Sequence, residues 1–417
     1  MSKEKKVLIV SYYFPPMGGV GVQRVSKFCK YLPQFGWKPV VVTPEPSTFY
    51  MTDKGMMDEV KHAEIHRIKA PDSFRTHKRA TGRDKPRIDS PLRKLARTLT
   101  WPDTHRGFAR RALPVIKELS SEVQAILVTA PPFSSLLMIP GLKKKLDIPI
   151  IADMRDPWVS HPVHDRQAWK KGKNRAAERE ALGASDTVIA ATRTHTEDLK
   201  QRYPEMEERI YYIPNGYDTE DFSAKKGKRM DGALRIVYSG IMGLEGINDG
   251  STLYAALRIL KDKEGLRPSD LRFEIIGEVA RKEEERMKDV EEFIDSPGFL
   301  PHKEAMARLE RADLAYLPYH ARYSYFIVPA KVYEYVGSGT PVLAEVDPTH
   351  ETASILRDTG TGMIADEDDV DAVVKALRLL LKGRFPYRPK RQHIRYFDRR
   401  NEVEYLARLL NELTQNA

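Results

Sequence analysis

Cysteine is almost absent from this 417-residue sequence, and other familiar residue patterns are missing as well. The single Cys29 cannot form an internal disulfide, so a disulfide-stabilised scaffold is excluded. Cys29 shares helical spacing with Val22, Val25 and Leu32, which predicts a buried core thiol rather than a nucleophile. With 25 Gly and 28 Pro, the chain is neither collagen-like nor of low complexity. The eleven histidines show no spacing typical of metal ligands, so we predict no metal site.

Long uninterrupted hydrophobic segments are also lacking. The first apolar run, residues 7–14, ends in two prolines without a small-residue cleavage site, so we expect no signal peptide. The uncharged stretch 125–142 is long enough to cross a bilayer, but three internal prolines would interrupt a helix there. We predict a strand, a loop and an amphipathic helix instead. Hydrophobic residues make up 41% and charged residues 31%, so we expect a globular, cytoplasmic protein.

Negative charge is in deficit, and the basic excess is concentrated in one segment. The formal net charge is +10, and twelve Lys and Arg stand against three Asp between Arg75 and Arg111. Within this segment, residues 91–101 (PLRKLARTLTW) combine an apolar helical stripe with basic residues and a terminal Trp101. Such a helix is suited either to an anionic membrane surface or to packing on its own domain. We expect no nucleic-acid partner, because few aromatics are present to stack bases and no recognition module is found.

Short apolar runs alternate with helical patterns along almost the whole chain, which predicts α/β domains with parallel sheets. A turn-rich segment at 214–218 and a polar stretch at 223–232 divide these runs into two series. Strands are expected, in chain order, at Val7–Val10, Val40–Thr43, Ile65–Ile68, Ala125–Thr129, Ile148–Asp153, Thr187–Ala190, Ile210–Ile213, Leu234–Ser239, Phe273–Ile276, Phe299–Leu300, Leu314–Leu317 and Pro341–Ala344. The two series predict two doubly wound, Rossmann-like domains facing each other across a cleft.

We expect the domains to divide the chain at about residue 215. The first covers 1–215 with the basic insertion near 72–112, and the second covers 216–390. Residues 391–417 contain a long terminal helix, Phe397–Leu413, with Asp398 as its N-cap.

Doubly wound sheets bind ligands beyond the carboxyl ends of their strands, so the loops after strands are the places to examine. The first is SYYFPPMGGVGVQR (11–24), in which Gly18, Gly19 and Gly21 lie just before a helix. Free N–H groups there favour an anion or a closely approaching sugar. The loop is not G-x-G-x-x-G and no acidic residue follows at the usual distance, so a nicotinamide site is not expected.

A second charged loop, IADMRDPW (151–158), follows directly on an expected buried strand. Asp153, Arg155 and Asp156 would face the cleft between the domains, with Arg155 and Asp156 either forming a structural pair or serving catalysis. We favour the catalytic role. Asp156 would orient or deprotonate an acceptor hydroxyl within hydrogen-bond reach.

The most specific segment is VPAKVYEYVGSGTPVLA (328–344), which predicts a helix that ends near Gly339. The amides of Ala330 and Lys331 would point outward from its N-terminus, towards a phosphate. Lys331 and Glu334 are three residues apart and share one face. A lysine beside a diphosphate and a carboxylate that accepts from ribose hydroxyls would suit a nucleotide-sugar donor.

These motifs resemble those of the family 4 glycosyltransferases (glycosyl transferases group 1), which have the GT-B fold. The resemblance rests on FPPMGGVGVQR (14–24), IADMRDPW (151–158), YIPNGYD (212–218) and PAKVYEYVGSGTPVLA (329–344), which follow the family's order and cover nearly the full length. It implies a retaining, metal-independent enzyme that uses a nucleotide-diphosphate sugar as co-substrate and needs no cofactor. Similar enzymes often act in polysaccharide or glycolipid synthesis.

The resemblance also implies roles for individual residues. Donor binding would fall to Gly18, Gly19, Gly240, Ala330, Lys331 and Glu334, and catalysis to Arg155, Asp156 and Lys331. Arg155-Asp156 occupies the place where many members carry His-Asp, and Glu334 matches the second Glu of the E-x7-E motif, which holds the donor ribose. Asn215-Gly216 would mark the hinge, and the last helix would cross back to the first domain.

The sequence departs from the family's pattern at two places. Phe326 stands where the first Glu of the E-x7-E motif is expected. The loop 240–246 reads GIMGLEG, in place of the Arg and Lys with which many members neutralise the diphosphate. The negative charge of the diphosphate would then be neutralised by Lys331, by helix amides, or by a more distant cation such as Arg24 or Arg193. We expect Lys331 to serve this role.

The sequence therefore predicts a retaining glycosyltransferase that moves a sugar from a nucleotide-diphosphate sugar to a glycan or lipid-linked acceptor. It would be cytoplasmic, and the basic segment would provide any attachment to the inner face of a membrane. Two alternatives stay open: a non-catalytic scaffold with a decayed donor site, and a nucleotide-sugar epimerase of the same fold. The first is motivated by Phe326 and by the neutral loop at 240–246.

Overall fold

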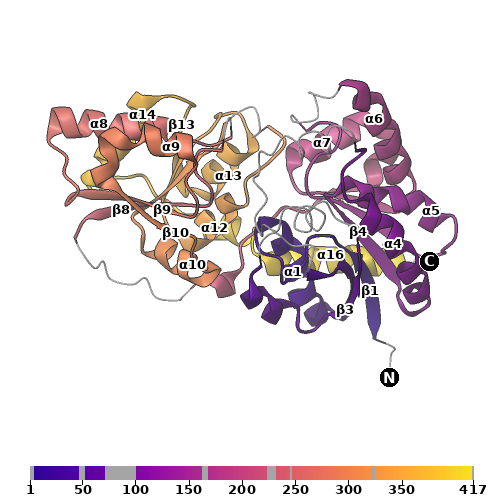
Figure 1. Cartoon of the computed structure of the whole chain (residues 1–417). Helices are drawn as coiled ribbons and strands as arrows, with labels where there is room; N and C mark the ends of the chain where they lie inside the picture. Colours follow the sequence, from indigo (N-terminus) through magenta and orange to yellow (C-terminus); the bar gives the residue numbers. More distant parts are fainter. Residues whose placement is uncertain are drawn as a thin grey trace, which may run out of the picture. The chain divides into compact units, whose positions relative to one another are not determined.

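The chain forms two units, each built around one parallel sheet (Figure 1). The structure, a computed structural model, describes residues 4–46, 52–70, 100–161, 168–222, 232–244, 247–320 and 325–415. The first unit comprises residues 1–214 and 402–417, and the second comprises residues 215–401. The chain therefore leaves the first unit at residue 214 and returns to it inside its last helix.

Seven parallel strands form the sheet of the first unit, in the order β3-β2-β1-β4-β5-β6-β7. Their bounds are β1 Lys5–Val10, β2 Trp37–Pro44, β3 Glu64–Ile68, β4 Ala125–Ala130, β5 Ile150–Met154, β6 Thr187–Ala190 and β7 Ile210–Tyr212. Val7 of β1 lies opposite Pro39 on one side and Ala125 on the other. Because the strand order reverses between β1 and β4, the carboxyl ends of these strands form a topological switch point, where doubly wound sheets bind ligands.

Helices cover both faces of this sheet, because successive strand residues point to opposite sides. Leu8 and Val10 share a core with α4 to α7, whereas Val7 and Ile9 share a core with α1 and α16. Cys29 lies in the latter core, which confirms the predicted buried thiol. The helices are α1 Val20–Tyr31, η1 Leu32–Phe35, η3 Lys54–Val60, α4 Arg106–Leu119, η4 Ser120–Glu122, η5 Phe133–Met138, α5 Ile139–Lys143, α6 Ala168–Gly183, α7 Arg193–Arg202, η7 Pro204–Arg209 and α16 Arg399–Gln415.

The second unit contains six parallel strands in the order β10-β9-β8-β11-β12-β13. They are β8 Leu234–Ser239, β9 Leu271–Ile276, β10 Ile294–Gly298, β11 Leu314–Pro318, β12 Val342–Glu345 and β13 Gly362–Ala365. The strand order reverses between β8 and β11, whose pairing sets Leu314 opposite Ile236. A second topological switch point therefore lies at the carboxyl ends of β8 and β11.

The second sheet is likewise covered on both faces. Ile236 and Tyr238 of β8 pack with α8 and α14, and Val237 packs with α10, α12 and α13. The helices of this unit are η8 Thr219–Asp221, α8 Ser251–Glu264, α9 Arg281–Arg286, η9 Lys288–Phe293, α10 His302–Arg311, α12 Lys331–Ser338, α13 Glu351–Thr359, α14 Val370–Leu381 and α15 Arg391–Arg395. Together the two units confirm the predicted α/β class with two doubly wound sheets.

The terminal helix α16 begins in the second unit and continues in the first (Figure 1, yellow). Asp398 precedes it and accepts a hydrogen bond from the amide of Arg400 (2.9 Å). Residues 391–401, which the sequence analysis grouped with the terminal helix, belong to the second unit. They are held there by main-chain hydrogen bonds between Tyr217 and the segment Phe397–Arg399.

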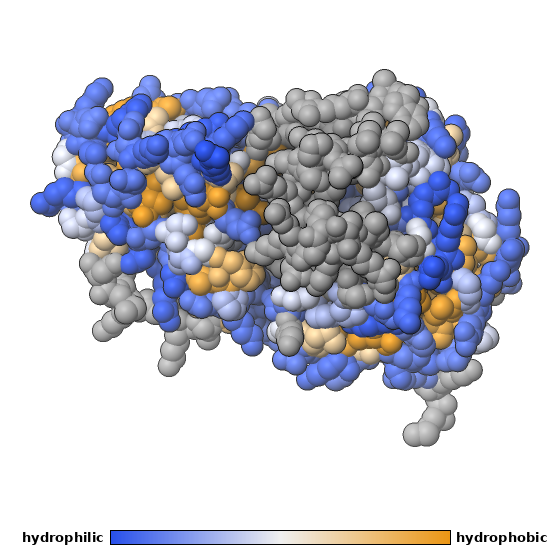
Figure 2. All heavy atoms as spheres, viewed as in Figure 1, coloured by the Kyte–Doolittle hydropathy of each residue, from blue (hydrophilic) through white to orange (hydrophobic). Residues whose placement is uncertain are grey.

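Hydrophilic residues predominate on the face of each unit seen in Figure 2, and apolar residues are exposed in smaller areas. Among the described residues, none of the helices is both long and apolar enough to span a membrane. The stretch 125–142 forms β4, η5 and the short helix α5, in agreement with the predicted strand, loop and helix.

The basic segment lies mostly outside the described residues, which resume at Thr100. Trp101 is described, and its indole N–H donates to the Asn174 side chain (2.7 Å) while the Lys173 ammonium lies 4.1 Å from the ring centroid. Trp101 also packs against the core of the first unit. Trp101 therefore packs on its own domain, and any membrane contact would depend on the residues before it.

Candidate functional site

The loop after β5 carries the two charged residues predicted to serve catalysis, and their environments differ. Arg155 donates to three main-chain carbonyls: those of Gly21, Pro131 (2.6 Å) and Ala130 (3.4 Å). Its guanidinium thereby ties the loops after β4 and β5 to the first turn of α1. This geometry favours a role for Arg155 in positioning these loops at the switch point over direct contact with a substrate.

Asp156, the next residue, has no hydrogen bond to its carboxylate within the described part of the chain. Burial raises the pKa of Asp156, and the neighbouring Arg155 offsets part of this effect. A carboxylate in this state can accept a proton from, or orient, a hydroxyl that approaches the end of β5.

Asp153 and Arg24 form a buried structural cluster, which corrects two sequence expectations. The Arg24 guanidinium donates to Asp153 (Nε to Oδ1, 3.1 Å), to the Pro214 carbonyl (3.0 Å) and to Glu402 of α16. Thr129 donates to the other oxygen of Asp153 (2.8 Å). Asp153 therefore does not face a cleft as expected, and Arg24 is not placed to neutralise a diphosphate. The positive charge of Arg24 instead neutralises the two buried carboxylates that flank it.

The glycine loop after β1 leads into α1, as the sequence predicts. Gly18 is buried and Gly19, the residue before the helix, has φ +94°, a conformation that favours glycine. No side chain caps this N-terminus, and Val20 at its start is 67% exposed. The N-terminus of α1 thus lies at the switch point of the first sheet, where the Val22 amide donates to the Gly19 carbonyl (3.3 Å) and the amides before it stand outside the helix ladder.

In the second unit, α12 brings Lys331 to the end of β8. The Lys331 ammonium donates to the Tyr238 hydroxyl (2.7 Å) and lies 4.0 Å from the centroid of the Tyr238 ring. A Cβ atom on Gly240 would lie only 2.9 Å from Lys331 Nζ, and Gly240 has φ +127°. The structure therefore places together two residues, Gly240 and Lys331, that the sequence analysis assigned to donor binding.

Burial lowers the pKa of Lys331 to about 7, and Glu334 on the same helix opposes this shift. The residues before the helix have their amides free of the helix ladder, since the first helical main-chain bonds run from Val332 to Pro329 and from Tyr333 to Ala330. The amides of Ala330 and Lys331 thus stand at the start of α12, whose first residue also carries the ammonium that lies at the end of β8. This arrangement is suited to a phosphate group.

The loop that follows β8 is shaped by Asn248, a residue that the sequence analysis did not single out. Its side-chain NH2 donates to the Tyr238 hydroxyl and to the Ile241 carbonyl (2.9 Å), and its oxygen accepts from the Leu244 amide (3.0 Å). Asn248 was missed because its partners lie up to ten positions away and no spacing rule relates them. Tyr238 was missed because it falls within the apolar pattern of a strand.

Two other residues named in the sequence analysis are Phe326 and Arg193. Phe326 contacts the ring of Tyr325 (centroids 4.6 Å apart), which in turn contacts His350 (5.3 Å). Tyr325 is itself 52% exposed. Arg193, considered as a distant cation, lies in the first unit with its guanidinium over the Tyr212 ring (5.6 Å).

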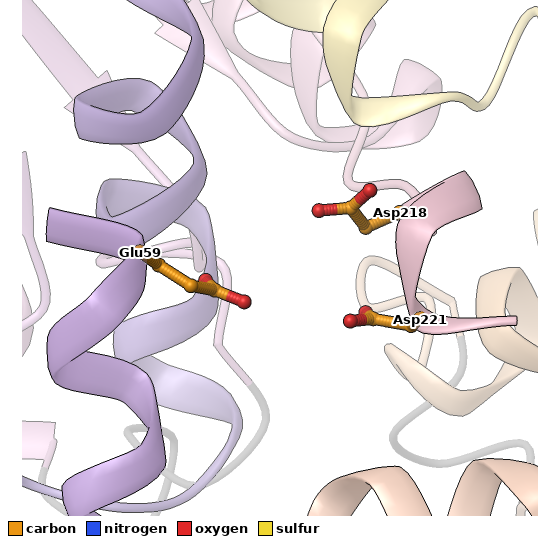
Figure 3. A group of neighbouring side chains, drawn as sticks. All are labelled: Glu59, Asp218 and Asp221. Atoms are coloured by element: carbon orange, nitrogen blue, oxygen red, sulfur yellow. The ribbon is translucent and has the colours of Figure 1, made fainter.

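Figure 3 draws three carboxylates, each of which has a partner within its own unit. Glu59 lies on η3 of the first unit, whereas Asp218 and Asp221 point the same way from η8 of the second. Each has a partner within its own unit: Glu59 bonds Lys27 (2.6 Å), Asp218 accepts from the Glu220 amide (2.9 Å), and Asp221 pairs with His302 (3.2 Å). One oxygen of each carboxylate is therefore paired within its own unit, and Glu59 Oε2 is buried without a hydrogen-bond partner among the described residues.

Comparison with solved structures shows the fold. Over 99% of this chain and 100% of the other, the chain matches sucrose-phosphate synthase from Thermosynechococcus elongatus (TM-score 0.69, 14% identity). WaaG, a glycosyltransferase involved in lipopolysaccharide biosynthesis, matches over 98% of both chains (TM-score 0.59, 16% identity). An α,α-trehalose-phosphate synthase (UDP-forming) from Burkholderia xenovorans matches over 98% and 100% (TM-score 0.64, 13% identity). These likenesses support the predicted GT-B-like fold of two domains.

Comparison with sequence families covers most of the chain. Residues 17–221 match Glycosyltransferase Family 4, and residues 234–383 match Glycosyl transferases group 1. No curated protein matches the sequence. The two matches include the glycine loop, the Arg155-Asp156 loop and helix α12, in the order that the motifs predicted. The chain belongs to the family 4 glycosyltransferases, a family of retaining glycosyl-transferring enzymes.

Proposed function

We propose that this glycosyltransferase takes its sugar from a nucleotide-diphosphate sugar held by the second unit, and passes it to a glycan or lipid-linked acceptor. Lys331 and the first amides of α12 would hold the diphosphate, and Glu334 would accept from the ribose hydroxyls. Gly18 and Gly19 would lie close to the donor, and Asp156 would orient the acceptor hydroxyl. Arg155 would keep the loops of the first unit in place.

One observation carries this proposal: the Lys331 ammonium lies against Gly240 at the switch point of the second sheet. The loop after β8 offers no Arg or Lys between residues 240 and 244, so the lysine from α12 supplies the charge there. A retaining transfer needs no dedicated nucleophile when the acceptor attacks on the face that the diphosphate leaves. The protein then contributes orientation and stabilisation of the departing phosphate.

A panel of nucleotides tests the donor site directly. Thermal unfolding would be followed with UDP, GDP, ADP, CMP and dTDP, for the wild type and for Glu334→Ala. A nucleotide at a hundredfold its dissociation constant adds about 2.7 kcal/mol to the free energy of unfolding. We expect one nucleotide to stabilise the wild type and not the variant, because the variant lacks the acceptor for the ribose.

The matched control is Glu304→Ala, because Glu304 is also a first-turn glutamate of a helix in this unit but is exposed and paired with Arg308. It should keep the full nucleotide-dependent shift. No shift with any nucleotide would turn the interpretation towards a scaffold with a decayed donor site. Acceptor-independent conversion of the nucleotide sugar into its epimer would instead favour the epimerase alternative.

The basic segment before Trp101 supports a lipid-linked acceptor, as in polysaccharide or glycolipid synthesis, and peripheral contact with the inner face of the membrane. Co-sedimentation with anionic and neutral vesicles measures this contact. We expect binding to anionic vesicles at low salt and its loss at high salt, since screening shortens the reach of the charges. Absence of binding at low salt would contradict the membrane hypothesis and leave the donor-site proposal untouched.

A further inference from the structure

The hydrogen bonds around the Tyr238 hydroxyl determine that it accepts a hydrogen bond from Lys331. A tyrosine hydroxyl has one proton to donate and two lone pairs that can accept. The proton goes to the Ile241 carbonyl (2.9 Å), and one lone pair accepts from the Asn248 side-chain NH2. The remaining lone pair accepts from Lys331 Nζ (2.7 Å).

Asn248 fixes this orientation from the loop that follows β8. Both protons of its amide are used, one on Tyr238 and one on the Ile241 carbonyl, and its oxygen accepts from the Leu244 amide. The residue is buried, with 5% of its surface exposed, so water does not substitute readily for these partners. The amide cannot be flipped without losing all of these bonds.

We infer that Tyr238 and Asn248 are positioning residues that hold the Lys331 ammonium against Gly240 and favour its protonated state. Asn248 occupies one lone pair of the hydroxyl and so turns the other towards the lysine. The hydroxyl oxygen and the ring face, 4.0 Å from Nζ, both favour a cation. This inference rests on the proposed function only for the claim that the positioned charge meets a diphosphate.

This arrangement opposes the effect of burial on the charge of Lys331. Burial alone would drive Lys331 towards the neutral amine, and its pKa is lowered to about 7. Within the part of the chain that the structure describes, the groups that face it are Glu334 on its own helix, Tyr238 on β8 and the Gly240 loop. Removing the hydroxyl removes a bond that favours the charged form and should lower this pKa further.

The test is a titration of Lys331 without any donor, by NMR of protein labelled with 13C-lysine. Lys331 is identified by the signal missing from Lys331→Met, and it titrates well below ordinary lysines. We expect Tyr238→Phe to lower its pKa by about one unit, the effect of one hydrogen bond to a charged group. Asn248→Asp should raise it, because it adds a nearby negative charge.

Tyr254→Phe is the matched control, because its hydroxyl is buried in the same unit and interacts with Glu283 rather than with Lys331. It should leave the Lys331 titration unchanged. The inference is overturned if folded Tyr238→Phe titrates as the wild type does, or if both variants shift the pKa in the same direction. Should Tyr238→Phe not fold, Asn248→Leu removes the donor to the Tyr238 hydroxyl without adding charge. It should lower the Lys331 pKa, and an unchanged titration in this variant overturns the inference.

Kinetics then separates the inference from the proposed function. If the Lys331 pKa falls in Tyr238→Phe and the basic limb of the pH–rate profile moves to lower pH with it, the inference and the proposed function are both supported. If the pKa falls while kcat, KM and the pH profile keep their wild-type values, the positioning role stands and the diphosphate role of Lys331 is wrong.

Discussion

Replacing Arg24 by Met is expected to lower the free energy of unfolding of the first unit by about 3–5 kcal/mol. Arg24 is 2% exposed, and its guanidinium lies between the carboxylates of Asp153 and Glu402. Without it, two buried carboxylates lose their cation and must either stay charged or take up protons, and each course costs free energy. Glu402 would also cease to anchor α16 to α1.

Tryptophan fluorescence in a urea titration measures this effect in the right unit, because all four tryptophans lie before residue 170 and none lies in 215–401. The control is Arg179→Met, which breaks an exposed pair with Glu205 (side chains 64% and 44% exposed) and should cost at most about 1 kcal/mol. Equal losses of unfolding free energy in the two variants would show that the buried Arg24 cluster stabilises the first unit no more than an exposed ion pair does.

Replacing Lys331 by Met is expected to lower kcat by about 10²–10³-fold, the usual effect of removing one group that stabilises charge developing in a transition state. Met keeps the apolar length of the side chain and removes the ammonium, so packing against Tyr238 is largely preserved. Initial rates with the donor identified by the nucleotide panel provide the measurement. Lys375→Met, at an exposed position of α14, is the control and should retain full activity.

The same lysine predicts a pH dependence with a definite sign. Its pKa of about 7 in the free protein means that the ammonium is lost as the pH rises above 7. A bound diphosphate should raise this pKa again, because an adjacent negative charge favours the protonated form. Nucleotide binding at pH 8 should therefore take up about 0.9 proton in the wild type and none at this position in Lys331→Met.

Calorimetry in two buffers of different ionisation enthalpy at pH 8 counts these protons. The difference between wild type and Lys331→Met isolates the lysine from other titrating groups. Equal proton uptake in the two proteins would place the diphosphate away from Lys331, whatever the effect on turnover.

The sequence was most informative where strands are buried on both faces. Thr187–Ala190 and Leu234–Ser239 were predicted with the bounds that β6 and β8 show. It failed at the two edges of the second sheet: β10 was expected at Phe299–Leu300 but runs over Ile294–Gly298, and β13 was not predicted. Edge strands are covered on fewer sides, and the β10 sequence IDSPG carries no continuous apolar run. The β13 sequence GMIA does carry a short one, Met363–Ala365, which was overlooked.

The candidate site was predictable as a set of loops, but not as a set of contacts. Helix α12 and the glycine loops could be read from local spacing, and the switch points followed from the order of strands. The contact of Lys331 with Tyr238 joins residues 93 positions apart, and that of Arg24 with Asp153 joins residues 129 apart. Local patterns do not determine such pairs, which is why Asp153 was misplaced and Asn248 was overlooked.

Because α16 returns to the first unit, cutting the chain after residue 214 does not separate it into two complete units. Residues 402–415 supply Val403, Leu406 and Leu410 to the core that contains Val7 and Ile9, so a fragment ending at 214 would expose part of one face of its sheet. The same packing brings the two ends of the described chain together, since Lys5 Nζ donates to the Asn411 side chain (2.8 Å). A short linker joining these ends would give a circular permutant that begins at Asn215. In that permutant each unit would be one continuous segment, and one covalent connection would join them instead of two.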